Sequence, residues 1–257
     1  MNTADSHNYP LKPLKWYKQL ATRKARREAG AFIIEGERAI RQVMTSHPDA
    51  LIEIITVNEP PPEYRHYPAR TITGSQLDKI CHTRTPQGTM AVVSLPPEAY
   101  SNRLPGKPGR KILLLEDIQD PGNVGTLIRT AAAFDFSGVI LTEKSADPFS
   151  PKCVQATAGT ILSVWLRRTS GYLELVQALQ KDGYFLVAAA LNGKPDPSVM
   201  HRSEPLLLAL GNEAAGLSPQ LLGAADYRFR IPTERDKAES LNVAASGAIC
   251  MYLSSVK

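Results

Sequence analysis

The chain has 257 residues, of which 43% are hydrophobic and 21% charged, so it can form one large or two modest globular domains and is not wholly disordered. No apolar run is long enough to span a bilayer, no signal-peptide core follows the start, and the odd, scattered cysteines exclude a disulfide framework, so we expect a cytoplasmic protein. The net charge of +5 favours an anionic partner without identifying it, and five histidines without metal-ligand spacing predict no metal cofactor.

The first segment with a clear bias is residues 11–30, which carry seven lysines and arginines against one acid. Trp16 and Tyr17 stand among the lysines, and interleaved basic and aromatic side chains suit phosphates and unstacked bases. A solvated helix that ends at Gly30 explains the same residues. We favour an RNA-binding helix, because the segment is N-terminal and no acids balance its charge.

Residues 1–98 are expected to form a first α/β domain, which includes this basic segment. Periodicity predicts strands at 31–36, 51–57 and 89–95 and helices at 37–46 and around 75–82. The stretch 96–110 holds four prolines, two glycines and little apolar content. We therefore place an interdomain linker at 99–110.

Residues 111–257 alternate strands and helices. Strands are expected at 111–115, 138–142, 184–191, 205–210 and 227–231, and helices at 124–134, 151–158, 171–181, 217–224 and 240–254. This alternation predicts a mostly parallel sheet covered by helices on both faces. Because ligands of such sheets gather at the carboxyl ends of strands, the functional site is expected in the loops after 115, 210 and 231.

The first of these loops, DPGNVG at 120–125, predicts a tight turn followed by a helix with Asn123 as its N-cap. Its spacing is neither GxGxxG nor GxxxxGK[ST], which excludes the dinucleotide-binding and P-loop readings. Arg129 falls on the less apolar face of the helix. Periodicity leaves open whether Arg129 is a solvated charge or a site residue.

The other two loops carry one acid and two polar candidates. Gly211 and Gly216 bracket a turn around Glu213, where backbone can approach a ligand closely, although an ordinary glycine-rich turn explains the same pattern. Near the C-terminus, Ser240 or Glu239 is expected to cap the last helix. Asn242, polar at the start of an otherwise apolar helix, is harder to explain by folding alone.

The order and spacing of three patterns are specific. NxGxxxR after one strand, GxExxG after a later one and IP…SLNVA near the C-terminus closely resemble the motifs of the SpoU (TrmH) family of RNA 2′-O-ribose methyltransferases, in the SPOUT superfamily. The resemblance covers 111–257. It extends to KQLATRKARREAGAFIIEGERAI and RTPQGTMAVV, which are similar to the family's ribosomal-protein-L30e-like substrate-binding domain. The subgroup suggested acts on ribosomal RNA, with transfer RNA as the alternative substrate.

The resemblance implies a fold and a cofactor. The fold is an N-terminal L30e-like α/β domain followed by a mostly parallel sheet with a trefoil knot, a rare exception to ordinary chain topology. The cofactor is S-adenosylmethionine, held in the knot by the positions that match the family's pocket: Leu210, Gly211, Ile231 and Leu241. A homodimer, with the active site completed across its interface, and a reaction without metal are implied as well.

The implied reaction moves a methyl group to a ribose 2′-hydroxyl, a weak nucleophile that needs proton removal and in-line positioning. The family's proposed proton acceptor matches Arg129. Because an arginine normally keeps its proton, a clamp on the substrate phosphate is the alternative role. Asn123 would orient Arg129 or the ribose, and Glu213, Ser240 and Asn242 would hold the loops and the target nucleotide.

One departure from the family pattern lies between Ile231 and Leu241. The stretch PTERDKAES is one residue longer than expected, lacks the usual glycine and has Thr233 in place of an apolar residue. It is either a harmless bulge or a change at the methionine end of the cofactor. The intact ESLNVA favours activity, against two alternatives: a catalytically silent RNA-binding factor and, least supported, another nucleotide-binding α/β enzyme.

Overall fold

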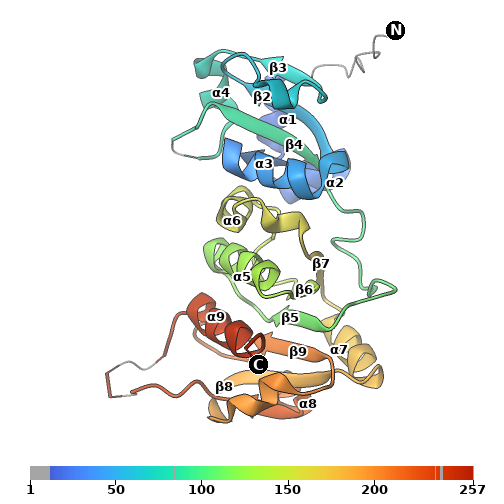
Figure 1. The fold of residues 1–257 in the computed structure, drawn as a ribbon, viewed down its shortest axis with the longest axis vertical. Helices are drawn as coiled ribbons and strands as arrows, with labels where there is room; N and C mark the ends of the chain where they lie inside the picture. Colours follow the sequence, from blue (N-terminus) through green and yellow to red (C-terminus); the bar gives the residue numbers. More distant parts are fainter. Residues whose placement is uncertain (1–11, 84, 235, 238–239, 257) are drawn as a thin grey trace. The chain divides into compact units, whose positions relative to one another are not determined.

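The computed structural model describes residues 12–83, 85–234, 236–237 and 240–256. The chain forms two compact units (Figure 1). Unit 1 holds the residues up to Pro97 together with Phe149–Leu162, and unit 2 holds Glu98–Pro148 and Ser163–Lys257. Contacts thus group Phe149–Leu162 with unit 1, although the segment lies in the stretch expected for the second domain. The limits of the folding domains, at 98 and 111, stay a prediction.

Unit 1 is built on a four-stranded sheet in the order β1-β4-β2-β3, in which β4 is antiparallel to β1 and β2, and β3 is parallel to β2. Its strands are β1 (Ala31–Glu35), β2 (Leu51–Thr56), β3 (Ala69–Thr71) and β4 (Thr89–Ser94). Its helices are α1 (Leu14–Gln19), α2 (Arg23–Ala29), α3 (Glu37–Ser46), α4 (Gly74–Ile80) and α6 (Pro151–Thr157), with short 3-10 turns at Pro48–Ala50, Pro62–Tyr64 and Thr160–Leu162. The strands and helices predicted between residues 31 and 95 are confirmed.

The basic segment forms two helices, α1 and α2, so the expectation of one helix is wrong, and its RNA-binding role stays a prediction. Thr22 separates them, because its hydroxyl accepts a hydrogen bond from Ala25 N (3.3 Å) and caps α2, which ends at Gly30 with φ +60°. Tyr17 and Arg26 are buried. The Tyr17 hydroxyl donates to the Glu53 carboxylate (2.8 Å), and burial followed by this bond raises the pKa of Tyr17 to about 12. One face of the segment therefore belongs to the core of unit 1.

Unit 2 is a six-stranded parallel sheet in the order β10-β8-β9-β5-β6-β7. Its strands are β5 (Lys111–Leu115), β6 (Gly138–Thr142), β7 (Trp165–Thr169), β8 (Phe185–Lys194), β9 (Leu206–Leu210) and β10 (Tyr227–Phe229). Its helices are α5 (Pro121–Ala133), α7 (Tyr172–Lys181), α8 (Pro219–Ala224) and α9 (Val243–Leu253), with a 3-10 turn at Pro197–His201. The α/β class and the mostly parallel sheet are confirmed.

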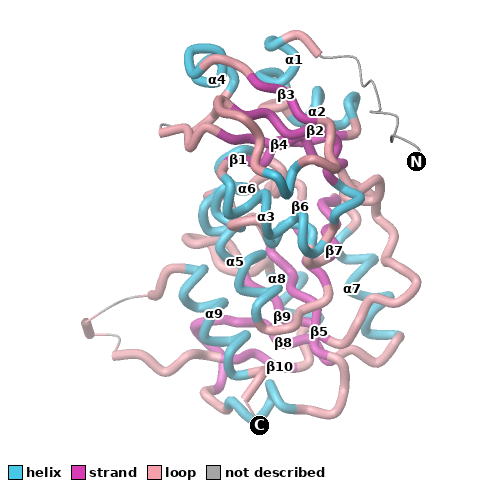
Figure 2. The backbone as a smooth tube through the Cα atoms, turned by 45° about the horizontal axis from the view of Figure 1, so that its top comes forward, coloured by secondary structure: helices cyan, strands magenta, loops and turns pink. Residues whose placement is uncertain are grey.

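Helices cover both faces of this sheet. Ala209 of β9 lies in a buried cluster with Leu221 of α8 and residues of α7. Side chains alternate along a strand, so Leu210 faces the other side, where α5 and α9 lie together (Figures 1 and 2). A Cβ on Gly247 of α9 would lie 2.3 Å from Leu127 Cδ2 of α5 and 2.8 Å from Leu210 Cδ1, so glycine lets α9 approach α5 and the sheet closely.

Strand β7 was not expected from the sequence, because two arginines interrupt its apolar pattern. At this sheet edge both side chains bond to backbone carbonyls: Arg167 Nε donates to Arg103 O (2.6 Å) and Arg168 Nε to Ser145 O (3.2 Å). Burial lowers the pKa of Arg167. The carbonyls satisfy donors of the two guanidinium groups, which allows a strand at a position where none was expected.

Candidate active site

The loops after β5 and β9 start side by side. Leu115 pairs with Leu210 at the end of the two parallel strands, and Glu116 N donates to Leu210 O (2.9 Å) one residue further on. Residues that are far apart in the sequence therefore begin their loops at the same edge of the sheet. This is the edge at which the sequence predicts the functional site.

Helix α5 begins earlier than predicted and has a different cap. Asp120 is the N-cap: its carboxylate accepts hydrogen bonds from the backbone N–H groups of Gly122 and Asn123, and Pro121 is the first helical residue. The prediction that Asn123 caps the helix is wrong. Because Asp120 takes that role, the Asn123 side chain is available for contacts outside the helix.

Asn123 joins the three sequence motifs. Its Nδ2 donates to Glu213 Oε1 (2.9 Å), and its Oδ1 accepts a hydrogen bond from Asn242 Nδ2 (3.2 Å). The partners lie 90 and 119 positions away in the chain. Three of the five residues expected to be catalytic thus form one hydrogen-bonded chain, Asn242–Asn123–Glu213.

Which of these side chains donates and which accepts follows from the two end residues, Asn242 and Glu213. Asn242 is the N-cap of α9, since its Oδ1 accepts from Ala244 N (2.8 Å) and Ala245 N (3.3 Å). The predicted cap at Ser240 is wrong, and Glu239 lies outside the described residues. With its oxygen used by the helix, Asn242 can only donate to Asn123, which in turn donates to an acceptor-only carboxylate, Glu213. Both amide orientations are therefore determined by their partners.

The loop that carries Glu213 folds back on itself. Asn212 Oδ1 accepts from Ala214 N (3.0 Å) and Ala215 N (2.9 Å), and Gly216 has φ +70°. A Cβ on Gly211 would lie 2.3 Å from the carbonyl carbon of Gly216. Because that neighbour is backbone and cannot move aside, the loop requires glycine at 211.

A cavity of about 340 Å³ lies beside this loop, within the usual size range of small-molecule sites. Its lining includes all four residues expected to bind the cofactor and two of those expected to be catalytic: Leu210, Gly211, Ile231, Leu241, Glu213 and Ser240. Thr233, at the departure from the family pattern, lines it as well. The wall formed by 189–192, in the second half of β8, was not predicted from the sequence. Only the strand order, which puts β8 next to β9, could have indicated it.

Arg129 stands apart from the cavity. It is exposed on α5, six residues after Asn123 or about 9 Å along the helix axis, while Leu127 and Ile128 are buried. Within the described part of the chain no hydrogen bond or ion pair of Arg129 is found, and it does not line the cavity. The structure therefore does not bring Arg129 to the other candidate residues of its own chain.

Metal ligands and membrane-spanning segments are both absent from the part of the chain that the structure describes. Its residues contain no group of three or more histidine, cysteine, aspartate or glutamate side chains placed to hold a metal ion. Nor does any helix among them have both the length and the apolar character needed to cross a membrane.

The chain matches two family models and several known proteins. The model of the SpoU rRNA Methylase family matches residues 110–252, and that of the MRM3-like substrate binding domain matches residues 12–91. The 23S rRNA (guanosine(2553)-2′-O)-methyltransferase RlmP of Bacillus subtilis is 33% identical over 248 residues, which are 93% of this chain and 94% of that protein.

Solved structures agree over nearly the whole chain. The AdoMet-bound rRNA methyltransferase from Sinorhizobium meliloti superposes with a TM-score of 0.79 at 27% identity, covering 94% of this chain and 93% of that one. AviRb from Streptomyces viridochromogenes, in complex with the cofactor AdoMet, gives 0.79 at 25% identity, covering 94% and 96%. The resemblance seen in the sequence is confirmed: the chain belongs to the SpoU rRNA Methylase family.

Proposed function

We propose that the protein transfers a methyl group from S-adenosylmethionine to a ribose 2′-hydroxyl of ribosomal RNA. The observation that carries this proposal is the hydrogen-bonded chain Asn242–Asn123–Glu213, whose Glu213 lines a cavity of small-molecule size, in a member of the SpoU rRNA Methylase family. Two of the proteins described above are named as ribosomal RNA methyltransferases, and the name of RlmP specifies a 2′-O-methyltransferase. We also propose a cytoplasmic location, in keeping with three cysteines outside any disulfide.

The cavity suits the cofactor. Leu210, Ile231 and Leu241 offer apolar surface for an adenine ring, while Gly211 lets backbone groups come close to a ligand. Ser240 and Thr233 supply hydroxyl groups on the lining for the polar parts. When bound, S-adenosylmethionine supplies an electrophilic methyl group on a sulfonium. That the pocket is formed by a trefoil knot stays a prediction.

The residues of the chain then have two tasks. Asn123 and Glu213 present a fixed arrangement of donors and acceptors that can hold a ribose in line with the methyl group. Arg129, with its exposed guanidinium, is suited to clamp the phosphate next to the target nucleotide or to assist removal of the hydroxyl proton. Ser240 would contact the nucleotide or the cofactor from the cavity lining.

The direct test is methyl transfer to ribosomal RNA that lacks its natural modifications, with transfer RNA as the alternative substrate. We expect incorporation at one ribose 2′-hydroxyl, mapped by resistance of the modified nucleotide to alkaline hydrolysis. A methyl group found on a base would refute the assigned reaction. S-adenosylmethionine binding without transfer to either RNA would favour the silent RNA-binding alternative.

RNA contact by the basic segment is part of the same proposal. Lys15 and Lys18 of α1 are exposed, beside the partly buried Trp16. For the double substitution Lys15→Gln/Lys18→Gln we expect weaker RNA binding. The slope of the logarithm of the RNA association constant against the logarithm of the salt concentration should fall in magnitude by about 0.7 for each phosphate of single-stranded RNA that the protein no longer neutralises. The Kd for S-adenosylmethionine should not change. Lys107→Gln/Lys181→Gln, which removes the same charge from exposed positions of unit 2, is the matched control. Equal slopes for the two double variants would exclude the contact.

A homodimer is the second partner we propose. Helix α9 is apolar on all sides: one face is buried in unit 2, yet Ile249 and Tyr252 are 37% and 54% exposed, and the Tyr252 ring packs on Phe134 at the end of α5. A helix that is apolar all round is normally covered. A second copy seated on this face would bring its own α5, with Arg129, to the site. Sedimentation should show a dimer that Tyr252→Glu converts to monomers; a monomeric wild-type protein at micromolar concentration would contradict it.

A further inference from the structure

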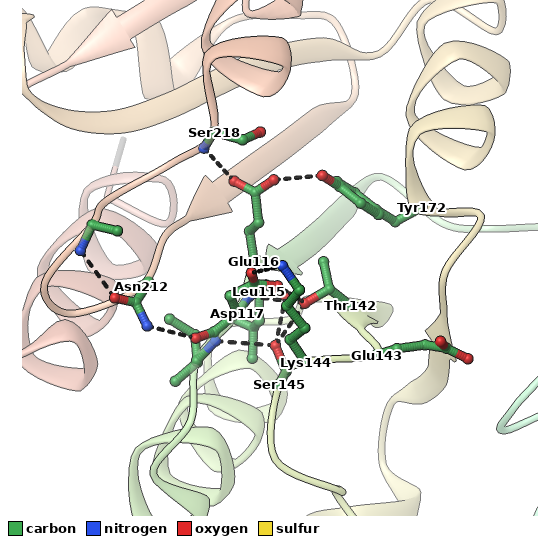
Figure 3. Close-up of polar contacts among 12 residues, drawn as sticks. Leu115, Glu116, Asp117, Thr142, Glu143, Lys144, Ser145, Tyr172, Asn212 and Ser218 are labelled. Atoms are coloured by element: carbon green, nitrogen blue, oxygen red, sulfur yellow. Dashed lines mark hydrogen bonds and ion pairs between the residues drawn. The ribbon is translucent and has the colours of Figure 1, made fainter.

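A buried carboxylate outside the cavity, Glu116, lies at the end of β5 next to the loop that carries Glu213 (Figure 3). The Glu116 residue is only 4% exposed. Its backbone N–H donates to Leu210 O (2.9 Å) and so extends the ladder between β5 and β9. A charge removed from water is costly unless it is hydrogen bonded, so the partners of this carboxylate indicate what it does.

Both carboxylate oxygens of Glu116 are used. Oε1 accepts from the Tyr172 hydroxyl of α7 (2.6 Å), and Oε2 accepts from the backbone N–H of Ser218 (2.7 Å). Burial and then the bond to Glu116 raise the pKa of Tyr172 to about 12, so the phenol remains a donor at neutral pH. Ser218 is the N-cap of α8, and it directly follows the loop 211–217. Glu116 therefore holds the far end of that loop.

The near end of the loop is held by the next residue of the same strand end. Asn212 Nδ2 donates to the carbonyl of Asp117 (2.9 Å), while its Oδ1 binds the loop amides (Figure 3). Asp117 is itself held, since its backbone N–H donates to Thr142 Oγ1 (2.8 Å) and Lys144 Nζ lies 3.6 Å from its carboxylate. Two consecutive residues after β5 thus hold both ends of one loop.

All the residues of the loop 211–217 line the cavity, and Glu213 within it bonds to Asn123. A shift of the loop would therefore move the lining of the cavity and the Glu213 carboxylate, which accepts from Asn123, together. We propose that Glu116 is a positioning residue. Through its hydrogen bonds to Ser218 and Tyr172 it fixes the loop 211–217, and so holds Glu213 and this side of the cavity in their places relative to each other. The expected effect on catalysis rests on the proposed function. The expected effect on the loop can be measured on the free protein.

The substitution that tests it is Glu116→Gln. Glutamine has nearly the same size, but it replaces one acceptor oxygen with an NH₂ group that cannot accept from Tyr172 or from Ser218. We expect faster hydrogen–deuterium exchange at the amides of 211–218 in the free protein, a raised Kd for S-adenosylmethionine by calorimetry, and a fall in kcat of about 10- to 100-fold, the scale of a misplaced catalytic group.

Glu53→Gln is the matched control. Glu53 is also a buried glutamate that accepts from a tyrosine hydroxyl, but it lies in unit 1. It should leave the exchange of 211–218 and the Kd for S-adenosylmethionine unchanged. If Glu116→Gln does not fold, Tyr172→Phe, which removes one donor only, should give the same changes at smaller size.

A double-mutant cycle with Glu213→Gln separates positioning from general stability. If Glu116 acts through Glu213, the loss of kcat from Glu116→Gln will shrink when Glu213 is already replaced, whereas independent effects add. Additive losses, or unchanged exchange at 211–218, would overturn the proposal. A wild-type protein that binds S-adenosylmethionine but methylates no RNA would defeat the proposed function alone, because exchange and cofactor Kd still test the role of Glu116.

Discussion

Replacing Arg129 by alanine is expected to lower kcat for methyl transfer by about 10²- to 10³-fold, the usual cost of removing one electrostatic contact to a reacting group. The Kd for S-adenosylmethionine should stay at the wild-type value, because Arg129 does not line the cavity. The free energy of unfolding should change by no more than about 0.5 kcal/mol, as is usual for exposed surface positions.

Two further variants identify the role of Arg129. Arg129→Lys keeps the positive charge and loses the planar fork, so a phosphate clamp should be recovered in part, while a role that needs the guanidinium geometry should not. Thr126→Ala, one turn earlier on the same exposed face, is the control and should retain wild-type activity. Full activity of Arg129→Ala with wild-type RNA affinity would remove the residue from the mechanism.

The sequence predicted much of the fold because the strands of unit 2 are continuous apolar runs with helical periods between them. It failed at β7, where Arg167 and Arg168 bond to backbone carbonyls that only the folded chain supplies. The caps were misplaced for a different reason. Asp120 and Asn123 are equally good N-cap residues, and which one serves depends on where the chain turns.

The candidate site was predictable in its members and not in its geometry. Motif spacing selected Asn123, Glu213 and Asn242, and the structure joins them by hydrogen bonds. Asn242 and Ser240 are both good N-cap residues, so only the folded chain shows that Asn242 serves as the cap and thereby sets the direction of these hydrogen bonds. The wall at 189–192 depends on which strands are neighbours, and that pairing is decided by the packing of the complete sheet. The local sequence pattern predicts the elements and the candidate residues, but it does not show which strands become neighbours, and that limits the prediction of the site.

Asn123→Asp should be at least as damaging to catalysis as loss of Arg129, and for an electrostatic reason. The exchange keeps an oxygen that can accept from Asn242, but it places a carboxylate where an amide now donates to Glu213 Oε1 over 2.9 Å. Two negative charges at that distance repel, so the chain Asn242–Asn123–Glu213 should break at its last link. Folding should be retained, since an acidic residue in the first turn of α5 is favourable to the helix dipole.

The pH dependence of this variant provides the sharpest test. As the pH falls, the two like-charged carboxylates of the variant should come to share a proton, and the resulting O–H donor restores a bond between positions 123 and 213. The rate of Asn123→Asp relative to wild type should therefore rise as the pH falls, whereas Asn123→Ala, which has no group to protonate, should stay equally inactive. Gln119→Glu makes the same change from amide to carboxylate at an exposed position that does not take part in the hydrogen bonds among Asn242, Asn123 and Glu213. This variant should keep the wild-type pH profile. Equal pH profiles for the aspartate and alanine variants would show that Asn123 does not act through Glu213.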